Sequence, residues 1–176
     1  MFASVMLVAM MAVTSSETLT LHMDYDASYS HMIEEGKYEQ VNYYFDWLHE
    51  RFWAEDAHTG KRDIQIRLFT FGGCNMTTEQ IIEEMDKEGF RPATVKELLA
   101  FGAEFPDCHM DGETVALSRI RIFDDMVPSI GPDKWDYNPG HVYRSIGQFA
   151  WGEKWGESLR QNTASRAHFR FLAVAS

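Results

Sequence analysis

The stretch Thr77–Pro106 constrains the fold more than any other part of the chain, because its local signals specify two helices. Thr77 and Gln80 form a capping box, in which each side chain can bond to the backbone N–H of the other residue. Thr94 and Glu97 repeat this pattern seventeen residues further on, at the same spacing. Apolar residues then recur at helical intervals after each box. The sequence therefore predicts a helix pair over residues 77–106.

The corner between these two helices is short. Gly89 fits the left-handed position that ends many helices. The segment after it is expected to be extended, because a residue that precedes a proline such as Pro92 is pushed out of the α region. Arg91 and Glu97 lie on either side of this proline, and we expect a buried pair that pins the corner rather than a functional pair. The predicted structural residues of the stretch are Thr77, Gly89, Arg91, Thr94 and Glu97.

Composition sets the broad class of the protein. With 176 residues, 45% of them apolar and 24% charged, the chain has the composition of a globular domain with a sizeable core. A net charge of −11 argues against a protein whose main partner is nucleic acid or an anionic membrane. Two cysteines do not form a disulfide framework, so a cytoplasmic location with free thiols is expected. No motif indicates a cofactor.

The N-terminal residues differ from the rest. We expect a leader or strand over residues 1–22 and a single α+β domain over 23–176. Met1–Val13 is apolar but has no Lys or Arg. A signal peptide normally has a positively charged start, so a strand or short helix docked on the domain is preferred. Export through residues 1–16 stays open.

Four elements are expected before the helix pair. Residues 17–24 alternate as a strand does, and residues 29–35 indicate a short helix that Gly36 ends. Residues 43–53 form an amphipathic, aromatic-rich stretch. Residues 64–71 alternate over their whole length and predict a strand.

The second half of the chain is predicted to be mostly β and loop. Short strands are expected over residues 113–117 and 119–123. Residues 124–168 mix Gly, Pro, Asp and Trp without a clear period, which is typical of long surface loops. Residues 169–174 predict a closing strand.

Two polar groups are candidates for chemistry. One is a candidate metal cluster, whose spacing matches no common site type, so solvated residues are expected instead: His22, Asp24, Asp26, His31 and Glu34. The other is the segment Asp107–Asp111, in which His109 could activate the Cys108 thiol. A polar turn is the preferred interpretation, and metal ligands are not expected.

The C-terminal part carries the strongest indication of binding. Residues 134–176 hold six Lys or Arg against three Asp or Glu, in contrast to the acidic remainder. Their aromatic and basic residues are of the types enriched in recognition hot spots, although several could pack in the core instead. The candidate ligand-binding residues are Trp135, Tyr137, Tyr143, Arg144, Trp151, Trp155, Arg160 and Arg166.

The order of elements and two motifs indicate a family. A Thr-capped helix, G-F-R-P-A-T-V-K-E-L-L, irregular loops and a closing F-R-F-L-A-V strand resemble a divergent C-type-lectin-like domain of the formylglycine-generating-enzyme type. That group has a G-x-R-L-P-T-x-x-E-W motif and a terminal G-F-R-like strand. The residues that correspond are Gly89, Arg91, Thr94, Glu97 and Leu98, with Phe169 and Arg170. Here Pro92-Ala93 replaces Leu-Pro, and the Asn-Val-Trp-Glu-Trp signature is missing.

This resemblance implies two helices packed on a mixed or antiparallel sheet with long irregular loops. The chain is more similar to a set of uncharacterised small bacterial proteins that share G-[FY]-R-P-A-T-x-x-E-L-L-A-F-G and a terminal R-F-L-A-V. Formylglycine-generating enzymes use two cysteines near the C-terminal part of the domain. Cys74 and Cys108 do not lie there, so that activity is not expected.

Three classes of function remain open from the sequence. A non-catalytic binding module that presents aromatic and basic loops to an unknown protein or ligand is favoured. The alternative is an interaction or assembly subunit of an oligomer, and a homo-oligomer is left open. An enzyme with a site around Asp107–Asp111 is the least favoured. Neither nucleic acid nor a membrane is an expected partner.

Overall fold

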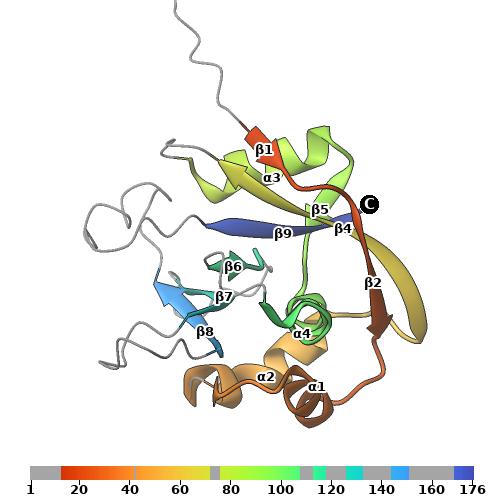
Figure 1. The fold of residues 1–176 in the computed structure, drawn as a ribbon, viewed down its shortest axis with the longest axis vertical. Coiled ribbons are helices and arrows are strands. Elements are labelled where there is room, and N and C mark those ends of the chain that lie inside the picture. Colours follow the sequence, from red (N-terminus) through yellow and green to blue (C-terminus); the bar gives the residue numbers. More distant parts are fainter. Residues whose placement is uncertain are drawn as a thin grey trace, which may run out of the picture.

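A computed structural model describes residues 13–41, 43–71, 76–107, 113–117, 126–132, 144–150 and 169–176. Within these residues, nine strands form one mixed sheet and four α-helices pack against it (Figure 1). The fold is therefore α+β, as expected, but four helices pack on the sheet where two were expected, because α1 and α2 also bury apolar residues against it.

The elements follow one another along the chain as strands interrupted by helices. The strands are β1 Val13–Ser15, β2 Leu19–Asp24, β3 Gln40–Val41, β4 Lys61–Phe71, β5 Phe90–Pro92, β6 Thr114–Val115, β7 Met126–Pro132, β8 Arg144–Ala150 and β9 Arg170–Ala175. The helices are α1 Tyr29–Gly36, α2 Tyr43–Glu55, α3 Thr78–Lys87 and α4 Val95–Glu104.

The closing strand lies in the middle of the sheet. The strand order is β1-β4-β9-β6-β7-β8-β3, with β2 also paired to β4 and β5 also paired to β9. β9 is antiparallel to β4 and β5 and parallel to β6. The pair β3–β8 is parallel as well, and the remaining pairs are antiparallel. Through β9, the helix-rich first half of the chain is joined to the β6–β8 part of the sheet.

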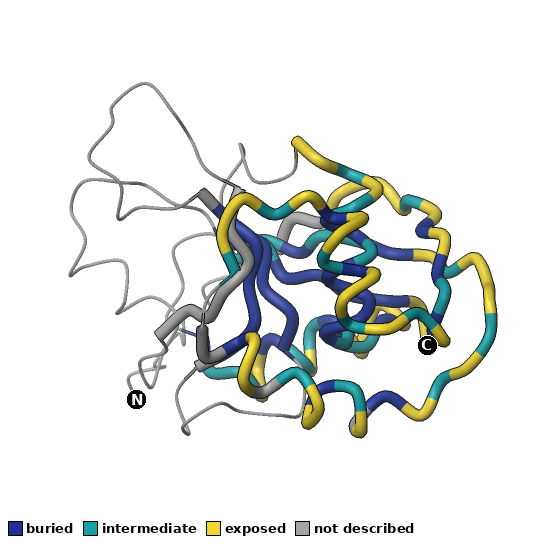
Figure 2. Tube along the Cα trace, turned by 90° about the horizontal axis from the view of Figure 1, so that it is seen from below, coloured by how far each residue is buried: buried dark blue, intermediate teal, exposed yellow. Residues whose placement is uncertain are grey.

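Alternate residues of β9 enter two separate hydrophobic cores, as the period of a strand requires. Leu172 and Val174 belong to a core that also contains buried residues of α1, α2 and α4. Phe171 and Ala173 belong to a second core with residues of α3. In Figure 2 the buried segments lie in the interior, and exposed segments lie outside them. The sheet thus separates α3 from the other three helices.

The predicted helix pair is confirmed, with a strand between its helices. Both capping boxes are formed: the Thr77 side chain accepts from Gln80 N, and the Thr94 side chain accepts from Glu97 N. Gly89 has a φ of 79°, in the left-handed region that favours glycine. The corner after Gly89 is extended, and it is also paired as β5, which the sequence did not predict.

The end of α1 corrects one expectation. The left-handed residue is Lys37, with a φ of 47°, whereas Gly36 remains inside the helix. A β-carbon at Gly36 would overlap the ring of Tyr38. The glycine is therefore explained by close packing of the following tyrosine and not by the helix end.

The prediction of loops over residues 124–168 is wrong for two segments. β7 and β8 pair in register from Met126↔Ala150 to Pro132↔Arg144. The predicted strand over 119–123 lies outside the described residues. The boundary placed at residue 22 falls inside β2, which pairs with β4 from Leu19 to Asp24. No helix among the described residues is both long and apolar enough to cross a bilayer.

Candidate functional site

The best-defined polar group lies at the corner between β5 and α4. We call it the corner cluster: Tyr25, Asp56, His58, Arg91, Thr94 and Glu97. The Glu97 side chain has no exposed surface. It accepts two bonds from Arg91, Nη2 to Oε1 at 2.7 Å and Nη1 to Oε2 at 3.0 Å, which form a bidentate ion pair. It also accepts from the Tyr25 hydroxyl at 2.5 Å and from Thr94 N at 2.7 Å.

These bonds change the acidity of both partners of Glu97. Burial raises the pKa of Tyr25, and the bond that its hydroxyl donates to Glu97 raises this pKa further. The bond to Glu97 also raises the pKa of Arg91. Both groups therefore keep their protons, and the carboxylate of Glu97 is surrounded by donors.

Asp56 forms the second half of the corner cluster. Its side chain is 1% exposed. It accepts from Thr94 Oγ1 at 2.7 Å and from both N and Nδ1 of His58, at 3.1 and 2.7 Å. Burial alone would raise the pKa of Asp56, but the bonds from Thr94 and His58 outweigh it and lower this pKa. Thr94 thus caps α4 and binds Asp56 at the same time.

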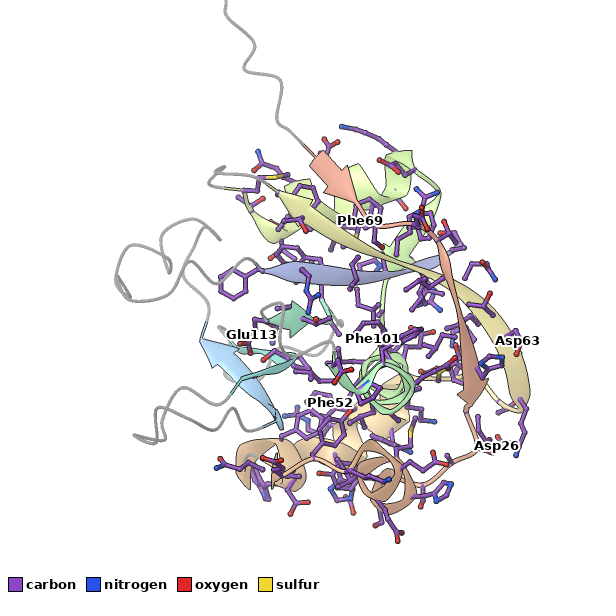
Figure 3. The ribbon with its side chains drawn as sticks, viewed as in Figure 1. Asp26, Phe52, Asp63, Phe69, Phe101 and Glu113 are labelled. Atoms are coloured by element: carbon purple, nitrogen blue, oxygen red, sulfur yellow. The ribbon has the colours of Figure 1, made fainter. Side chains whose placement is uncertain are left out.

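A second polar group joins β7 to the residue that precedes β6. Ser129 Oγ donates to Glu113 Oε1 at 2.5 Å, and both residues are buried. A β-carbon at Gly131 would overlap the Glu113 carboxylate, so the glycine leaves room for it. Arg170 N donates to Glu113 O at 2.9 Å on the neighbouring strand β9. Figure 3 labels Glu113 in this part of the sheet.

Most of the predicted ligand-binding residues lie outside the described residues. They are Trp135, Tyr137, Tyr143, Trp151, Trp155, Arg160 and Arg166. Arg144 is described only in its backbone, as the first residue of β8. What the structure gives is the position of the strand ends to which these stretches are attached.

The candidate metal residues are divided among different partners. His22 Nδ1 contacts Glu104 Oε1 at 2.8 Å, and Asp24 pairs with Lys61 at 3.2 Å. His31 pairs with Glu35 at 3.3 Å within α1. Asp26 and Asp63, labelled in Figure 3, are both exposed. Among the described residues, no group of three His, Cys, Asp or Glu side chains could hold a metal ion. Of the segment Asp107–Asp111, only Asp107 is described.

Sequence reasoning identified half of the corner cluster and missed the rest. The spacing of Arg91, Thr94 and Glu97 is local and readable. Tyr25 and Asp56 come from distant segments, and nothing in their own neighbourhood indicates that they meet α4. The pair of Glu113 with Ser129 was not predicted either, because Ser129 lies in a strand that was predicted as loop.

Comparison with family models, with curated proteins and with solved structures found no match for the chain.

Proposed function

We propose that the protein is a non-catalytic binding module of C-type-lectin-like fold. Its recognition surface would be built by two connections, residues 133–143 and 151–168, which flank β8. One observation carries this proposal: both connections are much longer than the distance between the strand ends that they join.

The first connection closes a hairpin. Pro132 and Arg144 are direct neighbours in the register of β7 and β8, so their α-carbons are about 5 Å apart. A hairpin commonly needs only about two to five residues for this step. Residues 133–143 exceed that need, and they contain Trp135, Tyr137 and Tyr143.

The second connection joins β8 to β9. In the register of the sheet, Arg170 pairs with Thr114, Thr114 pairs with Ile130, and Ile130 pairs with Ile146. Arg170 therefore lies level with Ile146, which is four positions before Ala150 at the end of β8. Three strand spacings across the sheet and four residues along it give roughly 20 Å between the two ends. An extended chain of this length reaches about 60 Å. Long connections on a rigid scaffold are where binding residues concentrate.

The residues in these connections suit one class of ligand. Trp151 and Trp155 provide flat apolar surfaces, and Arg160 and Arg166 provide planar cations. Such groups bind carboxylate, sulfate or phosphate groups and stack on planar ones. The mixed sheet and its closing strand β9, which pairs with β4, support a lectin-like scaffold, although four helices pack on the sheet where the resemblance implies two. We therefore expect an acidic ligand, such as a sulfated or carboxylated glycan.

The test uses an array of sulfated, carboxylated and neutral glycans with the full chain. We expect binding to acidic glycans and its loss in Trp155→Ala, with less than about 1 kcal/mol lost from the free energy of unfolding. Trp47→Ala is the matched control, because Trp47 lies on α2 with 62% of its surface exposed. It should bind like the unmodified protein.

Three results would contradict the proposal. One is binding that Trp155→Ala and Trp47→Ala reduce equally, and another is the absence of binding to any acidic glycan. The third is a loss of about 3 kcal/mol or more in urea unfolding of Trp155→Ala, as expected when a buried aromatic side chain is truncated. In that case Trp155 would belong to the core.

A further inference from the structure

His58 is held by a carboxylate that has almost no access to water. Its Nδ1 lies 2.7 Å from Oδ1 of Asp56, whose side chain is 1% exposed, while 41% of the His58 side chain is exposed. Asp56 is fixed in turn by Thr94 Oγ1. In neutral His58, this arrangement places the proton on Nδ1 and leaves the lone pair on Nε2. The ring is thus oriented as a nucleophile.

Arg62 and His58 both pack against the ring of Tyr25. Arg62 has its guanidinium carbon 4.9 Å from the centroid of the Tyr25 ring, and the His58 ring lies 5.0 Å from the same centroid. The Arg62 guanidinium donates to the Thr59 carbonyl at 3.2 Å, and Lys61 pairs with Asp24 at 3.2 Å.

The other described histidines have different surroundings. His22 has carboxylates near both ring nitrogens, Glu104 at 2.8 Å and Asp63 at 3.9 Å. His31 has its Nε2 3.3 Å from Glu35. The Nδ1 of His49 lies 2.5 Å from the Asp46 carbonyl, and the ring stacks on Tyr29 at 4.4 Å. Among the described histidines, His58 alone combines a buried carboxylate at Nδ1 with a partly exposed ring.

We propose that His58 is a phosphoryl-acceptor site, which is modified on Nε2 by a small donor such as a phosphoramidate or an acyl phosphate. Asp56 is its positioning residue. This proposal does not depend on the glycan-binding surface proposed above.

The reaction balances without a further reactant. The lone pair of Nε2 attacks phosphorus, the new N–P bond forms, and the P–N bond of phosphoramidate breaks. Its nitrogen is already protonated and leaves as ammonia. The ring keeps its proton on Nδ1, and the positive charge that develops on the imidazole is stabilised by the Asp56 carboxylate.

The experiment treats the full chain with phosphoramidate at neutral pH and follows each histidine by mass spectrometry of its peptides. We expect His58 to gain a phosphoryl group about tenfold faster than His22, His31 or His49, the factor that one hydrogen bond to a charged group supplies. Asp56→Asn should remove this advantage, because the amide cannot stabilise the charged ring. His58→Gln should remove the corresponding modified peptide.

The other histidines serve as internal controls for the concentration of the donor and the reaction conditions in the same sample. Their rates should be unchanged in Asp56→Asn. In concentrated urea, all sites should react at similar rates, since Asp56 no longer holds the ring. The reaction in urea thus separates the effect of the Asp56–His58 contact from any loss of stability in Asp56→Asn. The proposal is overturned if His58 reacts no faster than the others in the folded protein, or if its advantage persists in urea or in Asp56→Asn.

Discussion

Tyr38 lies against Gly102 of α4, and its hydroxyl donates to the carbonyl of Leu99 at 3.1 Å. A β-carbon at Gly102 would overlap this hydroxyl and would lie 2.6 Å from Cδ1 of Ile130. The approach of the segment after α1 to α4 therefore requires a residue without a side chain at this position.

The first prediction concerns Gly102→Ala. In an exposed helix, alanine is favoured over glycine by about 1 kcal/mol. Here we expect a net loss of about 1–3 kcal/mol in the free energy of unfolding, because the methyl group overpacks the core. Midpoints of urea unfolding provide the measurement.

A matched control is Gly89→Ala. Gly89 has a positive φ but no heavy atom within 4 Å of a β-carbon built there, so its cost is backbone strain alone. Tyr38→Phe should relieve part of the Gly102→Ala loss, because it removes the overlapping hydroxyl, and should relieve none of the Gly89→Ala loss. Equal effects of Tyr38→Phe on both variants would contradict this account.

The second prediction compares two N-caps. Thr77 and Thr94 both form capping boxes, but Thr94 also donates to the buried Asp56. Thr77→Ala should cost about 1 kcal/mol. Thr94→Ala should cost about 2 kcal/mol or more, since it also takes a donor from a buried carboxylate. Thr94→Ser keeps the hydroxyl and should stay close to the unmodified protein in thermal unfolding. Equal losses at both caps would refute the role of Asp56.

The third prediction tests the ion pair of the corner cluster. Arg91→Ala leaves Glu97 charged and fully buried, so we expect a loss of about 3 kcal/mol. Lys87→Ala is the control, because the pair Lys87–Glu84 lies on the exposed side of α3 and should contribute little. Urea midpoints of the two variants should therefore differ clearly. A small loss for Arg91→Ala would show that water reaches Glu97.

The fourth prediction concerns pH. The hydrogen bond to Glu104, with the charges of Glu104 and Asp63, raises the pKa of His22 above its ordinary value of 6.5. The folded state thus binds this proton more tightly than the unfolded state does. The contribution is complete below pH 6.5 and is lost as the pH rises through the folded pKa.

His22→Gln should reduce the fall in stability across this pH range. His31→Gln serves as the control, because the partner of His31 lies within its own helix, whereas the bond from His22 to Glu104 joins β2 to the end of α4. Thermal midpoints in a series of buffers measure both. An unchanged slope in His22→Gln would rule out this contribution.

What could be predicted from the sequence was local. The bonds of Thr77 with Gln80 and of Thr94 with Glu97 join residues three apart, and the positive φ of Gly89 depends only on its own backbone. Such features follow from spacing and residue type. The same holds for β4, whose alternation extends over most of its length.

β7 and β8 were missed because their pairing depends on each other. Pro128 lies inside β7, where proline normally argues against a strand. Its carbonyl accepts from Ala116 N, just beyond the end of β6. The N–H that proline lacks would point the same way, away from β8, so the β7–β8 ladder loses no bond at Pro128. The proline is acceptable because it faces the end of the short strand β6, which is a tertiary fact.

The corner cluster could be predicted only in part, because its residues come from segments that are far apart in the sequence. Tyr25 reaches Glu97 from 72 residues away, and Thr94 reaches Asp56 across 38 residues. The periodicity of a short stretch of sequence does not indicate such long-range contacts.

The central position of β9 has a consequence for how the chain folds during synthesis. Its partners β4, β5 and β6 are all made before it. A nascent chain that has emerged only as far as residue 168 therefore carries these strands without the one that joins them. Phe69, Phe90 and Val115, which form one core with Phe171, then lack a partner that they have in the finished domain. Folding must await a distant segment, which favours slow closure of the sheet and engagement by chaperones in the meantime.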